Sequence, residues 1–137
     1  MPRLTIELAN RIEEVRRLVE TTEDFAQNGG VPPAVVARFA LALDELATNV
    51  ISYAFNDDLA HIIQVELALE DGRLSAELID DGRAFDPLQA DAPDMAAALD
   101  DRPIGGLGIH IVRKTMDVVR YQRDGNKNRL TIAKVIG

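Results

Sequence analysis

Apolar residues recur along the chain with two different periods, and these periods divide it into expected strands and helices. Residues 3–8 alternate apolar and polar side chains, which is typical of a half-buried strand. From about Asn10 the apolar spacing becomes three to four residues, which predicts a helix that stops at Asn28-Gly29-Gly30. The side chains expected on the buried face of this helix are Ile12, Val15, Leu18, Val19 and Phe25.

The longest periodic segment begins at Val31-Pro32-Pro33 and runs to residue 55, where an Asn-Asp-Asp run ends it. Proline suits the first turn of a helix, because the first amides have no intrahelical acceptor. Glu45 and Asn49 are four residues apart, so they stack on one face, about 120° from the apolar stripe. That stripe consists of Phe39, Leu43, Leu46 and Val50. If the two side chains are held rigidly beside the core, the Glu45 carboxylate can accept a proton and the Asn49 amide oxygen can bind a hard cation. Two ordinary polar residues on a helix surface are the alternative interpretation.

The second half of the chain contains two expected hairpins. Residues 62–69 and 74–79 flank Glu70-Asp71-Gly72-Arg73, whose Asp-Gly step favours a tight turn. Residues 118–122 and 130–135 pair in the same way around Asp124-Gly125. The segment between the hairpins, residues 86–103, is rich in Asp, Ala and Pro and has one possible helical turn at residues 95–99. A short amphipathic helix over residues 109–116 follows it.

This order of elements predicts the fold class. Strand, two helices, hairpin, long loop, helix and hairpin together predict an α+β two-layer sandwich, with a mostly antiparallel sheet and helices on one face. The chain of 137 residues shows no internal repeat and no linker. We therefore expect one domain over residues 1–137.

Composition narrows the possible functions. Hydrophobic residues make up 47% and charged residues 28%, as in ordinary soluble globular proteins. The absence of cysteine excludes disulfides and thiolate metal sites. A net charge of −8 argues against a broad basic face for nucleic acid, and no apolar segment approaches the length of a membrane span. We expect a cytoplasmic protein without direct contact to nucleic acid or membrane.

Two further motifs carry candidate chemistry. The first, residues 79–87, places Asp80 at the end of a buried strand and Gly82 just after it, so that a carboxylate can face a ligand. A polar turn after a strand is the alternative. The second, Gly105-Gly106-Leu107-Gly108, opens a helix, where a backbone without side chains can approach phosphates. A flexible loop end is the alternative there, and neither a Rossmann fingerprint nor a P-loop fits the spacing.

The three motifs in this order resemble the ATPase superfamily shared by gyrase, heat-shock chaperones, histidine kinases and mismatch-repair proteins. Within it the chain looks most like the anti-sigma-factor serine/threonine kinases of bacterial partner-switching systems. The resemblance covers residues 43–55, 79–87 and 105–112, and a tail formed by residues 116–121 and 128–131.

The resemblance implies roles for individual residues. Glu45 would be the general base, and Asn49 would bind the Mg²⁺ that bridges the ATP phosphates. Asp80 would accept a hydrogen bond from the adenine amino group, Gly82 would leave room for the ring, and Thr131 would support Asp80 from behind. Gly106 and Gly108 would let their loop fold over the phosphates. The other implied nucleotide contacts are Ala84, Arg102, Gly105 and Leu107. Residues 86–103 would form a lid over the nucleotide.

The sequence departs from the family pattern at three positions. Ala84 stands where many members have a second glycine, and Tyr53 replaces a common histidine. Ile104 occupies the usual place of an arginine, and Arg102 lies two residues upstream. Arg102 either still reaches the phosphates or is a solvated loop charge.

The implied activity is ATP-dependent phosphorylation of a small anti-sigma-factor antagonist by a kinase that also binds a sigma factor or similar regulator, as a homodimer. A non-catalytic ATP-binding module that sequesters a partner is the alternative. A sensor histidine kinase is disfavoured because His61 and His110 lack the context of a phosphoacceptor. An interaction domain without nucleotide is disfavoured by the three motifs together.

Overall fold

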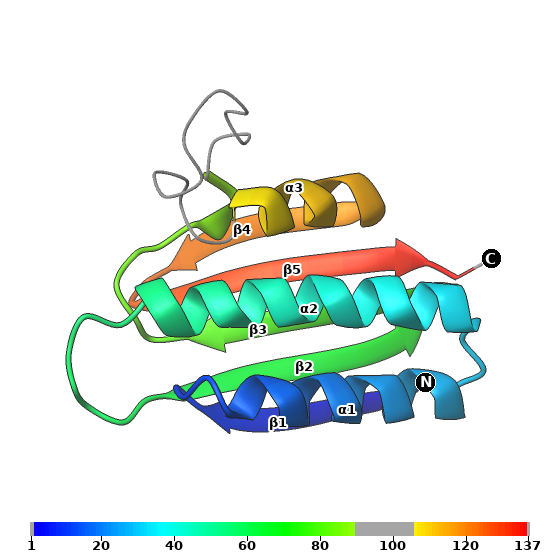
Figure 1. Ribbon diagram of the computed structural model, residues 1–137, viewed down its shortest axis with the longest axis horizontal. Helices are drawn as coiled ribbons and strands as arrows, with labels where there is room; N and C mark the ends of the chain where they lie inside the picture. Colours follow the sequence, from blue (N-terminus) through cyan, green and yellow to red (C-terminus); the bar gives the residue numbers. More distant parts are fainter. Residues whose placement is uncertain (1, 90–105, 137) are drawn as a thin grey trace.

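The computed structural model describes residues 2–89 and 106–136, with the side chains of the second range described from residue 108. A five-stranded sheet in the order β1-β2-β3-β5-β4 forms one layer, and three helices cover one of its faces (Figure 1). All strand pairs in this sheet are antiparallel, which confirms the predicted α+β sandwich. The elements are β1 (Arg3–Ala9), α1 (Glu14–Asn28), α2 (Pro33–Tyr53), β2 (Ile62–Glu70), β3 (Arg73–Asp80), the 3₁₀ turn η1 (Pro87–Gln89), α3 (Gly106–Thr115), β4 (Val118–Asp124) and β5 (Lys127–Val135).

Both predicted hairpins are present. Glu70 pairs with Arg73, so the loop between β2 and β3 has only two residues. Asp71 and Gly72 in that loop have φ of 55° and 72°, as a type I′ turn requires. The pair of Asp124 with Lys127 shows that the second hairpin also has a two-residue loop, in which Gly125 has a φ of 61°. These turns fix the register of four of the five strands.

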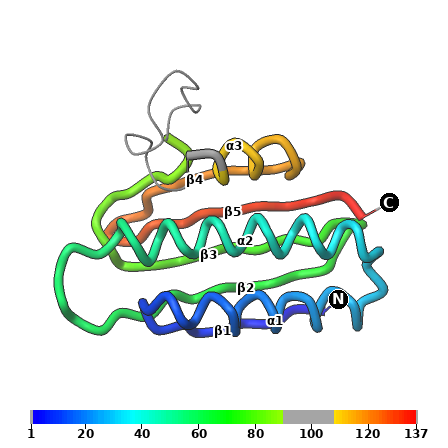
Figure 2. The backbone as a smooth tube through the Cα atoms, in the orientation of Figure 1, coloured from blue at the N-terminus to red at the C-terminus, as the bar shows by residue number. Residues whose placement is uncertain are grey.

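Helix α2 lies over the middle of the sheet, between α1 and α3 (Figures 1 and 2). The four residues of its predicted apolar stripe are all buried. They pack against alternate residues of the strands, such as Val65 and Leu78, which face the helices. The core therefore lies between the two layers, and α2 forms its central wall.

The start of α1 differs from the prediction. The helix begins at Glu14 rather than near Asn10, and the side chain of Ile12 is 50% exposed instead of lying on the buried face. Asn10, the residue after β1, is still held beside the residue that precedes β2: its amide donates to the His61 carbonyl, and its Oδ1 accepts from the His61 amide. The chain must then reverse before a helix can start, so residues 10–13 form turns and bends.

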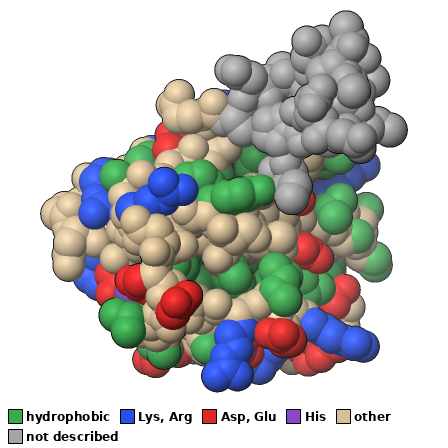
Figure 3. Space-filling model, turned by 60° about the vertical axis from the view of Figure 1, so that its left-hand side comes forward, with side chains coloured by type: hydrophobic (Ala, Val, Ile, Leu, Met, Phe, Trp, Pro, Cys, Tyr) green, Lys and Arg blue, Asp and Glu red, His purple; other side chains and the backbone are tan. Residues whose placement is uncertain are grey.

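Acidic and basic side chains are interspersed on the face shown in Figure 3. Among the described residues, no helix has the length and apolar character needed to span a membrane. Residues 90–105 lie outside the described residues. The expected turn at 95–99, most of the expected lid, Arg102 and Gly105 therefore fall outside them as well.

Candidate functional site

Asp80 ends strand β3, and its side chain is 3% exposed. Its Oδ1 accepts hydrogen bonds from the Gly82 amide at 2.8 Å and from Asn128 Nδ2 at 2.9 Å. Burial raises the pKa of the Asp80 carboxyl, and these two hydrogen bonds offset that rise only in part. Among the described residues, no donor bonds to Oδ2, so this oxygen is available to a ligand.

Gly82 connects this carboxylate to the end of α2. A Cβ at this position would lie 2.4 Å from the Ala54 carbonyl oxygen and 2.9 Å from Asp80 Oδ1. The next residue closes α2, because the Arg83 amide donates to the same Ala54 oxygen and Arg83 Nε donates to the Tyr53 oxygen, both at 2.8 Å. Glycine is thus required here by the close approach of α2. Its expected role in leaving room for a ring stays a prediction.

The second cluster joins α2 to α3. Asn49 is 6% exposed, and its Nδ2 donates to the Glu45 carbonyl at 2.7 Å and to Glu45 Oε1 at 3.0 Å. A Cβ at Gly108 would lie 1.9 Å from Glu45 Cδ, so a side chain at this position would push the Glu45 carboxyl away from where it lies against α3. The structure therefore brings together Glu45 and Asn49 of the predicted motif on α2 and Gly108 of the predicted motif on α3.

Asn49 has the chemistry of a ligand for a hard cation. Its amide hydrogens are directed to Glu45, and no donor among the described residues bonds to its Oδ1. The described residues contain no group of three His, Asp or Glu side chains able to hold a metal. A cation at Asn49 would therefore complete its coordination with phosphate oxygens and water, which is common for Mg²⁺.

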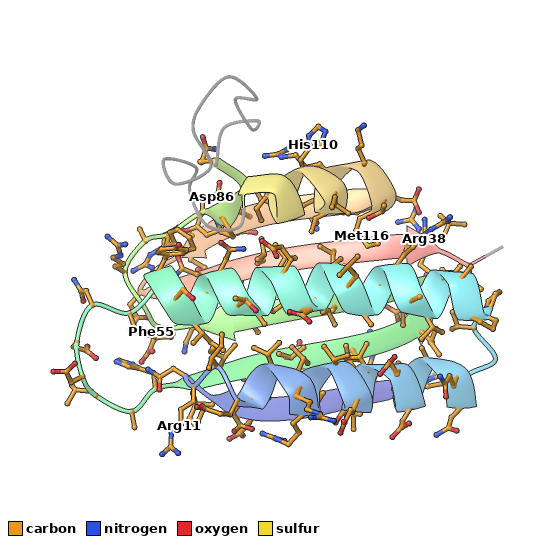
Figure 4. All side chains as sticks on the ribbon, viewed as in Figure 1. Arg11, Arg38, Phe55, Asp86, His110 and Met116 are labelled. Atoms are coloured by element: carbon orange, nitrogen blue, oxygen red, sulfur yellow. The ribbon has the colours of Figure 1, made fainter. Side chains whose placement is uncertain are left out.

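The glycines of the third motif lie within the helix rather than before it. Gly106, Leu107 and Gly108 form the first turn of α3, whereas the sequence predicted a helix from residue 109. The close packing on Glu45 explains why a glycine occupies a helical position. Ala84 lies exposed in the turn after Gly82. His110 lies on the outer side of α3 and points away from the sheet (Figure 4).

The placement expected for Thr131 is wrong. Thr131 lies opposite Glu77 in the β3–β5 register, and its hydroxyl donates to Glu77 Oε2 at 3.5 Å. Because side chains alternate along a strand, Thr131 and Glu77 lie on the face of the sheet away from the helices, whereas Asp80 lies on the helix face. Asn128, the register partner of Asp80, supplies the expected support instead.

Asn128, Tyr121 and Arg123 are site residues to which the sequence assigned no role. Tyr121 Oη donates to Asn128 Oδ1 at 2.5 Å, and Arg123 Nη1 donates to the same oxygen at 3.1 Å. Asn128 and Tyr121 belong to the tail that supports the resemblance, but only the pairing of β3 with β5 shows which tail residue meets Asp80. The register of the second hairpin places Asn128 opposite Arg123, but it does not specify the pairing of β5 with β3.

The chain belongs to the histidine kinase-like ATPase domain family, which it matches over residues 8–134. It is 37% identical to the serine/threonine-protein kinase BtrW of Bordetella bronchiseptica, covering 69% of this chain and 68% of that protein. It is 22% identical to the serine-protein kinase RsbW of Bacillus thuringiensis, covering 89% of this chain and 78% of that protein.

Solved structures agree on the fold. The structure of the RsbU and RsbW domains of Rv1364c from Mycobacterium tuberculosis matches with a TM-score of 0.73 at 18% identity, over 99% of this chain and 33% of that longer chain. A histidine kinase domain from Erythrobacter litoralis matches with a TM-score of 0.58 at 18% identity, over 91% of this chain and 60% of that chain. The family match and the two kinase relatives confirm the family that the three motifs predicted and the resemblance to serine/threonine kinases within it.

Proposed function

We propose that this protein is an ATP-dependent serine/threonine protein kinase of a bacterial partner-switching pathway. The observation that carries the proposal is the arrangement of two clusters along α2. Glu45, Asn49 and Gly108 form one, and Asp80 with Gly82 forms the other, at the C-terminal end of the same helix. Asn49 and Ala54 are five residues apart, or about 7.5 Å along the helix axis. One extended nucleotide can span that separation.

The adenine ring would lie at Asp80. The exocyclic amino group of adenine is a donor, and Asp80 Oδ2 is an acceptor to which no described residue donates. Because Asp80 is buried, an unmatched ligand would leave a polar group without a partner, which costs about 1–3 kcal/mol. Replacing Asp80 by Asn is expected to weaken ATP binding by about that amount.

The phosphates would lie toward Asn49 and the first turn of α3, whose amides point along the helix axis. Asn49 Oδ1 would hold Mg²⁺, which when bound supplies neutralisation of phosphate charge. Arg102, Gly105 and Leu107 remain proposed contacts, as does Ala84. Residues 86–103 would cover the nucleotide.

Glu45 would be the general base. The hydroxyl oxygen of a protein serine or threonine forms a bond to the γ-phosphorus, the bond from that phosphorus to the bridging β–γ oxygen breaks, and ADP leaves. The hydroxyl proton passes to the Glu45 carboxylate. Asn49 Nδ2 donates to Glu45 Oε1 and holds this carboxylate in place, which leaves Oε2 for the incoming hydroxyl.

The phosphoacceptor would be a small anti-sigma-factor antagonist, and the second partner a sigma factor or similar regulator. The two relatives, named as a serine/threonine-protein kinase and a serine-protein kinase, support a protein hydroxyl group as the phosphoacceptor. A cytoplasmic homodimer is part of the same proposal.

Calorimetry with ATP, with and without Mg²⁺, tests the nucleotide site, and transfer of labelled phosphate to a co-purifying partner tests the activity. We expect ATP to bind more tightly with Mg²⁺ and the label to appear on a serine or threonine. ATP binding without transfer would favour the non-catalytic module. The absence of binding at millimolar ATP would refute both.

A further inference from the structure

Asn128 is a buried side chain whose amide is fully used by its surroundings. It is 3% exposed, at the start of β5, and makes five hydrogen bonds with other described residues. Its Nδ2 donates to Asp80 Oδ1 at 2.9 Å and to the Arg83 carbonyl at 2.8 Å. Its Oδ1 accepts from the Phe85 amide at 3.3 Å, Arg123 Nη1 at 3.1 Å and the Tyr121 hydroxyl at 2.5 Å.

These partners fix which way the amide points. An amide N–H and a guanidinium can only donate, so the atom facing Phe85 and Arg123 must be the oxygen. A carbonyl can only accept, so the atom facing Arg83 must be the nitrogen. The amide therefore cannot flip without losing partners on both sides, and its donor is directed at Asp80.

We propose that Asn128 is a positioning residue that makes the site select purines with a 6-amino group over purines with a 6-oxo group. This inference rests on the proposed function, since it concerns the same nucleotide site. Two groups that only donate, Asn128 Nδ2 and the Gly82 amide, point at Asp80 Oδ1. That oxygen must accept from both, so any proton on the carboxyl would sit on Oδ2, the atom left for the ligand.

The charge state of Asp80 then decides the ligand. An ionised Oδ2 accepts from an amino group, whereas a protonated Oδ2 donates to a keto oxygen. Burial and the neighbouring Asp81 favour the protonated form, and the hydrogen bonds from Asn128 and Gly82, with the charge of Arg123, favour the ionised form. The hydrogen bond from Asn128 therefore acts together with that from Gly82 to favour the ionised form, which is the form that can accept from adenine.

The first test measures the Asp80 carboxyl by carbon-13 NMR in the nucleotide-free protein across pH. The pKa of Asp80 is expected to rise in Asn128→Ala, because one hydrogen bond to the ionised form is lost. Arg129→Gln is the matched control: Arg129 is the next residue of β5 but pairs with Glu77 and Asp124 on the other face. An unchanged Asp80 titration in Asn128→Ala would overturn the proposal, whether or not the protein binds ATP.

The second test compares ATP with inosine triphosphate, which carries a 6-oxo group. The preference for ATP is expected to fall about tenfold in Asn128→Ala, the equivalent of one hydrogen bond. Asp80→Asn tests the same idea with Asn128 intact. Asn128 Nδ2 and the Gly82 amide would then bind the oxygen of the new asparagine amide, which directs the NH₂ group of that amide toward the ligand. The preference should therefore invert toward inosine triphosphate.

The outcomes separate the two proposals. If the unchanged protein binds neither nucleotide, the proposed function fails, while the titration still decides the role of Asn128. If it binds ATP but Asp80→Asn keeps its preference for ATP, the positioning role of Asn128 is wrong and the ATP site stands. Should Asn128→Ala fail to fold, the Asp80→Asn comparison alone decides.

Discussion

Glu45 and Asn49 lie side by side on α2, yet their chemistry assigns them different tasks. Glu45→Gln keeps size and polarity but removes the proton acceptor. We expect phosphate transfer to fall by about 10²–10⁴-fold, the usual worth of a positioned general base, while ATP still binds. Asn49→Ala removes the cation ligand and should instead weaken Mg²⁺-dependent ATP binding. Transfer kinetics and calorimetry on the same samples separate the two effects.

The control for this pair is Asp44→Asn, a carboxylate-to-amide change one residue away. Asp44 is exposed, and among the described residues it accepts only from the Thr48 hydroxyl, at 3.3 Å, so transfer and binding should both be unchanged. A normal rate of phosphate transfer in Glu45→Gln would show that Glu45 is not the general base, and the proposed ATP site would still stand.

Thr131 offers a second prediction at the scale of one residue. Thr131→Val is expected to leave ATP affinity unchanged, because this side chain faces Glu77 on the outer face of the sheet. Calorimetry of the variant is sufficient. A loss of affinity comparable to that of Asp80→Asn would mean that Thr131 supports the carboxylate after all.

Glu14 gives a pH-dependent prediction. Its hydrogen bonds from Arg17 and from the Ala9 amide lower its pKa from 4.5 to about 2. A lowered folded-state pKa stabilises the fold above the ordinary value, and this contribution disappears as the pH falls from about 4.5 toward 2. Glu14→Gln should therefore reduce the urea midpoint at pH 6 and make little difference near pH 2.

Glu20→Gln is the matched control for Glu14, because Glu20 pairs with Arg16 where both side chains are more than 60% exposed. It should change the urea midpoint little at either pH. A Glu14→Gln effect of equal size at both pH values would show that packing, rather than ionisation, is responsible.

At the scale of elements, the α2–β2 connection is tied to the end of β3 through His61. Its Nε2 contacts Asp57 Oδ1 at 2.8 Å, its Nδ1 contacts Asp81 Oδ1 at 3.0 Å, and its ring stacks on Phe55. The hydrogen bond with Asp57, aided by Asp81, raises the pKa of His61. A raised folded-state pKa means stabilisation that is complete below 6.5 and lost as the pH rises through the folded value.

We therefore expect hydrogen exchange in residues 55–62 and 80–83 to quicken as the pH rises above 6.5, beyond the intrinsic effect of pH. His61→Gln should remove this excess, since glutamine does not titrate. His110→Gln, an exposed histidine on α3, serves as the control. Equal excess exchange in His61→Gln would exclude His61 as the titrating group.

The same scale shows what the sequence could predict. The hydrophobic period and the Asp-Gly turns were sufficient to place every described α-helix and strand except α1 within a few residues, because each of these signals is local. The start of α1 was missed because Asn10 is held by His61, 51 residues away. Asn128 was missed for the same reason: which side chain meets Asp80 depends on register between strands distant in sequence. The helical position of Gly108 depends likewise on its contact with Glu45.

The edge strand β1 illustrates how such distant contacts also protect the fold. Its outer side carries the Glu7 carbonyl and the Ala9 amide, which bond to Arg17 Nη2 at 2.6 Å and to Glu14 Oε1 at 3.1 Å. Glu14 and Arg17 of α1, which also pair with each other, thus provide hydrogen-bond partners for the backbone groups on this edge. They prevent another strand from pairing with this part of β1.

At the scale of the whole molecule, the proposed nucleotide site draws on both layers. Asp80 and Asn128 come from β3 and β5, whereas Glu45 and Asn49 come from α2 and Gly108 from α3. A ligand bound there contacts the sheet and the helices at once, so it should stabilise the complete fold rather than one element. At a concentration a hundred times its dissociation constant, ATP with Mg²⁺ raises the free energy of unfolding by about 2.7 kcal/mol. For a domain of this size that corresponds to a rise in Tm of roughly 9 °C.

Thermal unfolding with ATP and Mg²⁺, with ATP alone and with tripolyphosphate and Mg²⁺ checks this prediction. We expect the full rise only with ATP and Mg²⁺, a smaller rise without the metal, and little with tripolyphosphate, which lacks the adenine that Asp80 would bind. The same rise with tripolyphosphate would show that phosphate charge alone stabilises the protein. In that case the sheet side of the site, and with it the role of Asp80, would be wrong.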